Sequence, residues 1–270
     1  MEPLYISDSE YDAIHAVRAS YVKTLWSATP AHLYAQRIAE QRDESDAFRI
    51  GRALHCRALR PDAYAAEFAV SPKFDRRTKA GKEAAAEWQA ANAGVGTVLD
   101  EGESEMVERM ADAIADHESA ATLLRMATLR EATFLADLHG QAAKCRVDAL
   151  SPDGAVLLDV KTAASAAPRA FARSCADFGY HLQMEFYRQV LAEHGVTVRH
   201  VAIVAVEKAA PHCVAVYELD MADLDAMRDV VARCVQTYRN CIATGVWPGY
   251  APGVQPIRIP EWAIRPEAEA

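Results

Sequence analysis

Hydrophobic and polar positions follow a strand-like pattern between Leu129 and Lys161. Three short runs, 129–137, 142–150 and 155–161, are separated by turn sequences. The first separator contains His139-Gly140, and the second is Ser151-Pro152-Asp153-Gly154. Pro and Asp early in a four-residue turn, with Gly after them, reverse the chain. The pattern therefore predicts three consecutive strands, of which the last two form a β-hairpin.

Three charged residues of this hairpin are expected on one face. Side chains alternate across a strand, so Asp159 and Lys161 share a face. If Leu150 pairs with Ala155, Asp148 lies opposite the residue at 157 and diagonal to Asp159. Diagonal neighbours are roughly 7–8 Å apart, close enough for two carboxylates to bind one hard cation. An ordinary solvent-facing strand is the alternative interpretation of these three charges.

Helical patterns lie on both sides of the predicted strands. Pro168 suits the first turn of a helix, and a second helix is expected from Tyr180 to His194, with Gln183 and Tyr187 four positions apart on one face. Further elements are a strand over 197–206, an edge strand over 214–219 and one long helix over 221–244.

The first hundred residues read as helical. Ser7 and Glu10 have capping-box spacing, and Thr29-Pro30 suits a helix start. A helix is expected over 46–59, stopped before a proline, and another over 101–117. The glycines at 94 and 96 suggest a break. We expect one domain, with a helical region at 1–98, a core at 99–244 and an extended tail at 245–270.

Length and composition fit a globular protein. The chain has 270 residues, of which 51% are hydrophobic and 25% charged. No apolar run approaches the ~20 residues that span a bilayer, and the acidic start lacks a signal sequence, so we expect no membrane contact and a cytoplasmic location. The six cysteines contain no C-x-x-C pair and lack the spacing of an iron–sulfur cluster; reduced thiols are expected.

The net charge of −9 argues against a protein that coats nucleic acid nonspecifically. A net negative charge is compatible with a local basic surface that binds DNA. The candidate for DNA contact is the group Arg76, Arg77, Lys79 and Lys82 at the expected start of a helix. Positive charge opposes the dipole at that end of a helix. A solvated basic turn is the alternative.

Two acids and a lysine suit metal-assisted cleavage of a phosphodiester. A cation held by carboxylates lowers the pKa of bound water and stabilises transition-state charge. An ammonium group can orient the attacking hydroxide or neutralise the phosphate. The arrangement D-x(10)-D-x-K, formed by Asp148, Asp159 and Lys161, resembles the PD-(D/E)xK nuclease superfamily. That resemblance implies an α/β fold with the αβββαβ core of the restriction endonucleases, preceded by the helical region.

Two further motifs resemble the RecB-like branch of this superfamily. They are Q-x-x-x-Y, at Gln183 and Tyr187, and G-x-A-L-H, at 51–55. Six ordered segments between residues 27 and 191 resemble the RecE-type (exonuclease VIII) nuclease domain: SATPAHLY, GRALHCRALRP, FDRRTKAGKEAAAEW, KCRVDAL, DVKTAASAAPRAFARS and FGYHLQMEFY.

The RecE-type resemblance implies roles for individual residues. Asp148 and Asp159 would hold Mg²⁺, with His55 and the Val160 carbonyl completing the site; an imidazole ligand favours tolerance of Mn²⁺. Lys161 would position the attacking water. Gln183 and Tyr187 would line the site. Glu131, on the first strand, is a further candidate carboxylate or an ordinary surface residue. The 5′-phosphate contact is unassigned, with Arg37 and the basic group among the candidates.

The same resemblance implies an exonuclease that degrades linear double-stranded DNA from its ends, 5′ to 3′, releasing 5′-phosphate nucleotides. It also implies a ring-shaped homo-oligomer, a tetramer or a trimer, and a RecT-type single-strand annealing partner in recombination. Three alternatives stay open. They are an endonuclease or single-strand nuclease of the same fold, a DNA-binding subunit without catalysis, and a hydrolase of small phosphates.

Overall fold

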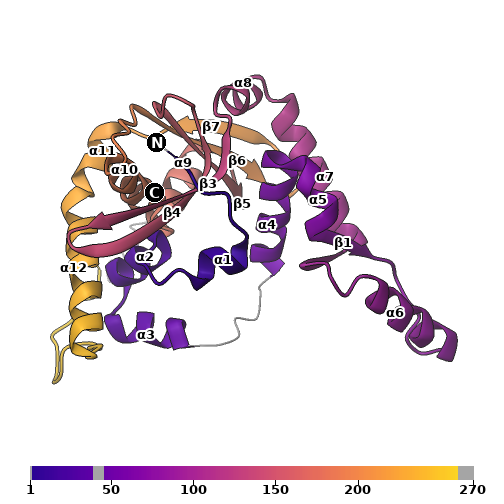
Figure 1. Cartoon of the computed structure of the whole chain (residues 1–270), viewed down its shortest axis with the longest axis horizontal. Helices are drawn as coiled ribbons and strands as arrows, with labels where there is room; N and C mark the ends of the chain where they lie inside the picture. The colour runs from indigo at the N-terminus through magenta and orange to yellow at the C-terminus, as the bar shows by residue number, and fades with distance from the viewer. Residues whose placement is uncertain (1, 39–45, 261–270) are drawn as a thin grey trace, which may run out of the picture.

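The computed structural model describes residues 2–38 and 46–260 of the chain. Its centre is a five-stranded sheet of order β3-β4-β5-β6-β7 (Figure 1). The strands are β3 (Leu129–Leu138), β4 (Gln141–Leu150), β5 (Val156–Ala163), β6 (His200–Glu207) and β7 (Val214–Glu218). Within this five-stranded sheet β5 and β6 pair in parallel while the other neighbours are antiparallel, and a parallel pair needs a long crossover. Helices α9 (Pro168–Asp177) and α10 (Tyr180–Ala192) form that crossover. The predicted α/β fold with three antiparallel strands, helices and a fourth strand is confirmed.

The turn between β3 and β4 follows from its two residues. His139 has φ 56° and Gly140 φ 76°, and Leu138 pairs with Gln141 across them. Two positive φ values define the tight turn whose twist matches paired strands. Asp137 accepts a hydrogen bond from the Gly140 N–H at 2.7 Å, which holds the turn closed.

The turn between β4 and β5 is longer than predicted, and this changes the register. Leu150 pairs with Leu157, so the predicted pairing with Ala155 is wrong. The Ser151 N–H donates to the Val156 carbonyl at 2.9 Å, which closes the loop inside that pair. The shift is two residues, and an even shift keeps every side chain on its predicted face.

Two hydrophobic cores cover the two faces of the sheet. One packs α10, α2 (Ala19–Ser27) and α12 (Arg228–Thr244) against the strands, and it includes the fully buried Phe134 and Phe186. The other packs α4 (Asp46–Leu59) and α7 (Glu101–Asp116) against β5 and β6. Each buried large apolar side chain contributes about 1.5–3 kcal/mol, so both helical layers are held firmly to the sheet. Figure 1 shows these layers on opposite sides of the strands.

The remaining elements include three that the sequence did not predict. Those expected are α1 (Asp8–Ala13), with its predicted Ser7 capping box, and α3 (Pro30–Ile38). The sequence did not predict two helices, α5 (Pro61–Glu67) and α8 (Glu118–Met126). It also did not predict the two-stranded parallel sheet of β1 (Phe68–Ser71) and β2 (Thr97–Asp100). Helix α6 (Lys79–Ala91) lies between β1 and β2 in the chain, and together they form an arm that projects from the body (Figure 1).

Two expectations near the C-terminus are corrected or refined. The single helix predicted over 221–244 is two helices, α11 (Met221–Ala226) and α12, separated at Met227. This break buries both Leu224 and Val231 in the same core. The first residues of the tail pack on the body of the protein: the ring centres of Trp247 and Tyr34 are 5.4 Å apart. Positions 261–270 of the predicted tail lie outside the described residues.

Gly154→Ala is expected to destabilise the protein. Gly154 has φ +74°, and an added Cβ would lie 2.3 Å from Val196 Cγ1. The left-handed conformation alone costs an L-residue about 1–2 kcal/mol. Thermal unfolding should therefore show a melting temperature several degrees lower. Gly94→Ala is the matched control, because that glycine has no positive φ and open space around it. Equal melting temperatures for the two variants would contradict this account of the turn.

Candidate metal centre

Three acidic residues occupy one row across the sheet. The pairing of β3 with β4 skips one position, at which Glu131 stands across from Asp148. The pairing of β4 with β5 ends at Ala149 and Leu158, one residue before Asp148 and Asp159. The corrected register therefore places Asp148 level with Asp159, nearer than the diagonal arrangement that the sequence predicted.

The backbone is irregular at this row. Glu131 adopts φ +49°, which is rare for a residue with a side chain beyond Cβ. Residues held in such a conformation cost about 1–3 kcal/mol and gather at functional sites. On β4 the alternation also changes, since Val147 packs in one core and Ala149 in the other. The strands are therefore irregular at this point, and the carboxylates of Glu131 and Asp148 both lie near the imidazole of His55.

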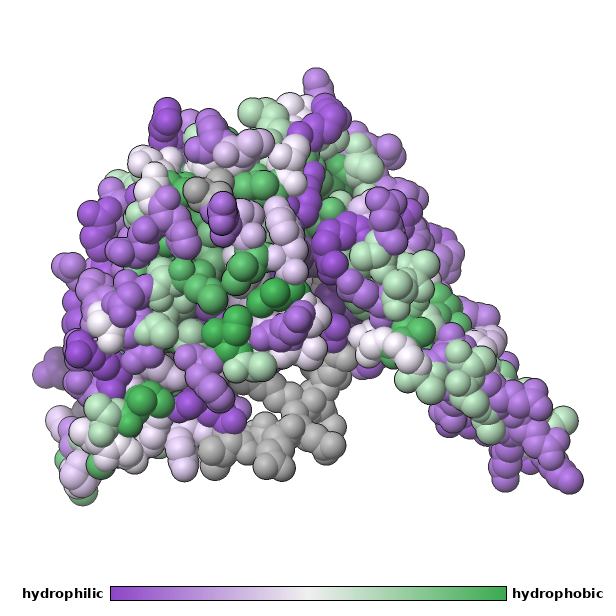
Figure 2. Space-filling model, in the orientation of Figure 1, coloured by the Kyte–Doolittle hydropathy of each residue, from purple (hydrophilic) through white to green (hydrophobic). Residues whose placement is uncertain are grey.

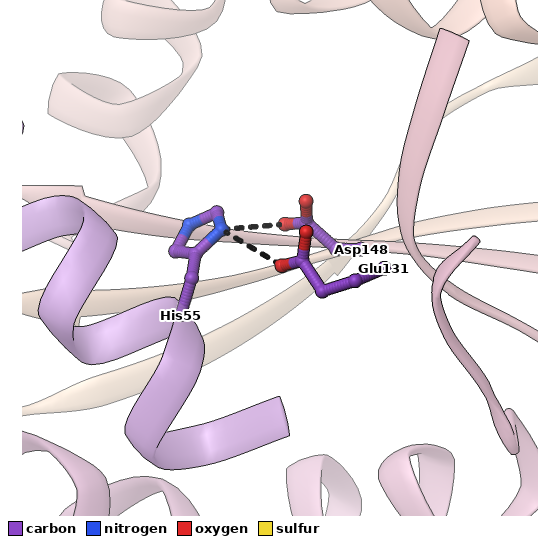
Figure 3. A group of neighbouring side chains, drawn as sticks. All are labelled: His55, Glu131 and Asp148. Atoms are coloured by element: carbon purple, nitrogen blue, oxygen red, sulfur yellow. Dashed lines mark ion pairs between the residues drawn. The ribbon is translucent and has the colours of Figure 1, made fainter. Parts of the chain in front are cut away.

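His55 reaches the acids from α4, as Figure 3 shows. Its Nδ1 atom lies 3.9 Å from Glu131 Oε1 and 3.5 Å from Asp148 Oδ2. Its Nε2 atom lies 2.7 Å from the carbonyl oxygen of Val160. With a hydrogen on Nε2, the ring donates to that carbonyl and turns the Nδ1 lone pair toward the carboxylates. Histidine ligands of metals are commonly oriented by a backbone carbonyl in this way.

The backbone of Val160 holds two site residues at once. Its carbonyl contacts His55, and its N–H donates to Asp148 Oδ2 at 2.7 Å. Val160 itself is fully buried in the core beneath α4 and α7. Packing of this one side chain therefore fixes the position of both a carboxylate and an imidazole.

Asp159 is turned toward Lys161 and Gln183. It is 1% exposed, its Oδ2 forms an ion pair with Lys161 Nζ, and its Oδ1 accepts from Gln183 Nε2 at 3.0 Å. Burial raises the pKa of Asp159, and the ammonium of Lys161 opposes that shift. Burial would lower the pKa of Lys161, but the carboxylates of Asp159 and Asp148 outweigh it and raise the pKa. Lys161 is therefore held in its charged form.

Gln183 and Tyr187 form hydrogen bonds next to the site. Gln183 Nε2 also donates to the Tyr187 hydroxyl at 3.4 Å, while its Oε1 accepts from Lys23 Nζ at 3.2 Å. The amide of Gln183 thus joins a carboxylate, a phenol and an ammonium group. Its four-residue spacing from Tyr187 on α10 makes this possible, because both side chains point to the same face.

The residues present fit a divalent cation. One ligand atom from each of His55, Glu131 and Asp148 lies within 4.8 Å of the other two. Burial and the charge of Asp148 raise the pKa of Glu131 to about 7. Crowded carboxylates of this kind are stabilised by a bound cation, and one nitrogen with carboxylate oxygens is a ligand set for a divalent metal. Asp159 stands beside this group and is already paired with Lys161.

Of the three acids, Glu131 lines a cavity of about 300 Å³, whereas Asp148 and Asp159 are buried behind it. Its lining includes His55, Glu131 and Lys161, together with Phe48, Arg52 and Tyr180. Of these, Phe48, Arg52 and Tyr180 were not predicted as site residues. Lys23, whose Nζ contacts Gln183, was also missed. Arg52 is the variable position of G-x-A-L-H and Tyr180 lies within FGYHLQMEFY, whereas Lys23 and Phe48 lie outside the recognised motifs. None of the four belongs to a pattern that marks it as a site residue.

The predicted basic group does not line this cavity. Arg76, Arg77, Lys79 and Lys82 lie at and before the start of α6, on the projecting arm. Figure 2 shows that the tip of this arm is hydrophilic and that hydrophobic residues gather toward its base. Residues 72–96 carry five basic and three acidic side chains in a chain of net charge −9. DNA contact by this group stays a prediction.

The family can now be assigned. Residues 19–260 match the family described as a PDDEXK-like domain of unknown function (DUF3799). The chain belongs to this family. The superfamily inferred from Asp148, Asp159 and Lys161 is therefore confirmed, whereas the finer RecE-type assignment stays a prediction.

A solved structure shares the fold at low sequence identity, and a second gives a weaker match. The crystal structure of a "putative exonuclease" from Eubacterium rectale superposes with a TM-score of 0.63 at 13% identity, covering 98% of this chain and 100% of that one. A "phage related exonuclease" from Haemophilus somnus 129PT gives a TM-score of 0.36 at 11% identity, covering 87% of this chain and 100% of that one. A search of curated proteins found no match. Across the described residues, no helix is long and apolar enough to cross a membrane.

Glu131→Gln is expected to stabilise the metal-free protein and to weaken its response to a cation. The folded-state pKa of about 7 exceeds the ordinary 4.5, so the folded protein holds a proton that the unfolded chain releases between these values. The stability from this group is complete below pH 4.5 and is lost as pH rises through 7. In EDTA at pH 8, the variant should therefore melt higher than the unsubstituted protein.

Addition of Mn²⁺ or Mg²⁺ should raise the melting temperature of the unsubstituted protein more than that of Glu131→Gln. Glu105→Gln is the control, since Glu105 is exposed and its one ion pair among the described residues is with Arg109 on α7. Equal cation-induced shifts in the Glu131 variant and the unsubstituted protein would exclude Glu131 as a ligand.

Proposed function

We propose that this protein is a divalent-cation-dependent deoxyribonuclease that degrades linear double-stranded DNA from its ends. The observation that carries the proposal is the meeting of His55, Glu131 and Asp148 next to the ion pair of Asp159 with Lys161. The family assignment supports a nuclease-like fold. Both the "putative exonuclease" and the "phage related exonuclease" are compatible with action at ends.

Each residue has a role that its contacts support. Glu131, Asp148 and His55 would hold the cation, with Asp159 and the Val160 carbonyl at its edge. Mg²⁺ is the proposed ion, with Mn²⁺ tolerated because of the imidazole. A bound divalent cation supplies Lewis-acid polarisation of the phosphoryl group and a lower pKa for water.

Lys161 acts on the attacking nucleophile and on the phosphate. Its ammonium group stays charged beside Asp159, and its side chain is 17% exposed, facing the cavity. It can therefore donate hydrogen bonds to the water that attacks phosphorus or to a phosphoryl oxygen. Gln183 holds the Asp159 carboxylate in place through the opposite oxygen. In-line attack with loss of the 3′-oxygen leaves a 3′-hydroxyl on the nucleotide released from the 5′ end and a 5′-phosphate on the remaining strand, so each nucleotide released afterwards carries a 5′-phosphate.

The finer features of the proposal come from the RecE-type resemblance. They are the 5′ to 3′ direction, a ring-shaped homo-oligomer and a RecT-type annealing partner in recombination. A ring would hold the enzyme on its substrate topologically, which compensates for the weak electrostatic attraction of an acidic chain. A DNA-binding subunit without catalysis is the less favoured alternative, because Asp148, Asp159 and Lys161 are all present.

Lys161→Met is expected to abolish cleavage of linear duplex DNA in Mg²⁺. Loss of the ammonium group removes the donor to the nucleophile, and loss of a comparable electrostatic donor lowers kcat by about 10²–10³-fold. The assay compares linear and closed circular duplexes, with a fluorophore at one 5′ end or one 3′ end to report direction. Arg109→Met is the charge-matched control, because Arg109 is exposed on α7 and pairs, within the part of the chain that the structure describes, with Glu105 alone.

Loss of linear DNA alone, abolished in the Lys161 variant, is the expected result. Cleavage of the closed circle would identify an endonuclease. Folded protein that cuts neither substrate in Mg²⁺ or Mn²⁺ would overturn the proposed activity.

A further inference from the structure

Lys23 is a second ammonium group at the site, and it comes from a different element than Lys161. It lies on α2, and its Nζ donates to Gln183 Oε1 at 3.2 Å. The same Nζ lies 5.9 Å from the centre of the Tyr180 ring, and Lys161 Nζ lies 5.2 Å from that centre. Two ammonium groups therefore approach one phenol ring, and Gln183 connects Lys23 to the carboxylate of Asp159.

The charge of Lys23 is not balanced within the described part of the chain. Lys161 is paired with Asp159, whereas Lys23 forms no ion pair with any described carboxylate. Burial and the neighbouring charge of Lys161 lower the pKa of Lys23 to about 8. Keeping an unpaired lysine beside another lysine costs free energy, and a bound anion would recover it. The proposed substrate supplies phosphate groups at this place.

Two exposed aromatic rings lie at the start of α10, where Lys23 packs. Phe178 is 60% exposed and stacks on Tyr180 with ring centres 5.8 Å apart. Trp26 is 40% exposed and is one turn along α2 from Lys23. The side chains of Lys23 and Trp26, both on α2, pack against Gly179. A Cβ added there would lie 3.3 Å from Lys23 Cδ and 3.5 Å from Trp26 Cζ3. Nucleobases stack on exposed rings, and phosphates bind adjacent cations.

We propose that Lys23, Trp26 and Phe178 form a nucleotide-binding subsite beside the catalytic centre. Lys23 binds a phosphate of the DNA strand, and the two rings stack on the base attached to it. The inference rests on the proposed function and adds where the strand lies, between α2 and the start of α10. The phosphate is either the terminal 5′-phosphate or an internal one, and the two have the same chemistry.

The first test measures DNA binding without cleavage. Fluorescence anisotropy with a labelled duplex in Ca²⁺ gives the dissociation constant over a range of salt concentrations. Lys23→Met should weaken binding about tenfold, because it removes one charge-assisted hydrogen bond. It should also reduce the slope of log K against log salt by about 0.9, the value for one phosphate contact. Lys23→Arg should keep the slope, and Arg109→Met should change neither quantity.

The second test measures cleavage in Mg²⁺ on duplexes with 5′-phosphate or 5′-hydroxyl ends. Lys23→Met should raise KM about tenfold with kcat within twofold. A loss confined to 5′-phosphate ends assigns Lys23 to the terminal phosphate, and an equal loss on both ends assigns it to an internal phosphate. Phe178→Ala should raise KM on normal DNA and have no effect on a duplex whose terminal nucleotide lacks its base.

Two results would overturn the subsite. One is an unchanged salt slope in Lys23→Met with a fall in kcat alone, which would mean that Lys23 only positions Gln183. The other is an equal effect of Phe178→Ala on normal and abasic ends. Melting temperatures of all variants control for folding, and Phe178→Ala tests the subsite without touching Lys23. If the unsubstituted protein binds DNA but cleaves none, the proposed function fails while the binding test still decides the subsite.

Discussion

The repulsion among three carboxylates in one row of the sheet is the constraint on which the rest of the site depends. Glu131, Asp148 and Asp159 would push one another apart if the protein did not compensate them. The compensation visible in the structure is specific: Lys161 and Gln183 bind Asp159, and the Val160 N–H binds Asp148. No hydrogen bond of this kind is made to Glu131 by the described residues; burial and the charge of Asp148 raise its pKa, and a cation would relieve both.

The two hydrophobic cores stabilise the fold enough to hold these carboxylates close together. Helix α4 is pressed onto β5 by buried residues such as Leu54 and Leu158, and this places His55 over the acids. Helix α10 is fixed on the other face by Leu182 and Phe186, on either side of Gln183 in sequence. Close-packed protein interiors do not deform easily. The two helices therefore keep His55 and Gln183 in place despite the repulsion among the carboxylates.

The sequence predicted the elements of the site better than their relative positions. Turn residues and alternation located β4 and β5, and the G-x-A-L-H segment placed His55 on a helix with the observed bounds of 46–59. The register was wrong because Ser151 and Asp153 form a wider loop through their own side chains, which a list of turn-forming residues does not reveal. Lys23 and Tyr180 were missed because only tertiary packing brings α2 to the start of α10. The arm of β1, β2 and α6 was read as helix alone, since two four-residue strands carry little periodicity.

In the proposed function, the arrangement of charge also links the binding of cation and DNA. The chain carries a net charge of −9, and Glu131 and Lys161 both line the cavity that a phosphodiester would enter. Before a cation is bound, the carboxylates would repel the phosphate, whereas the ammonium groups of Lys23 and Lys161 would attract it. Binding of the cation and binding of DNA would then favour each other by the same factor. Such a site would avoid holding DNA without its metal, and the two lysines would set how much of the attraction remains without it.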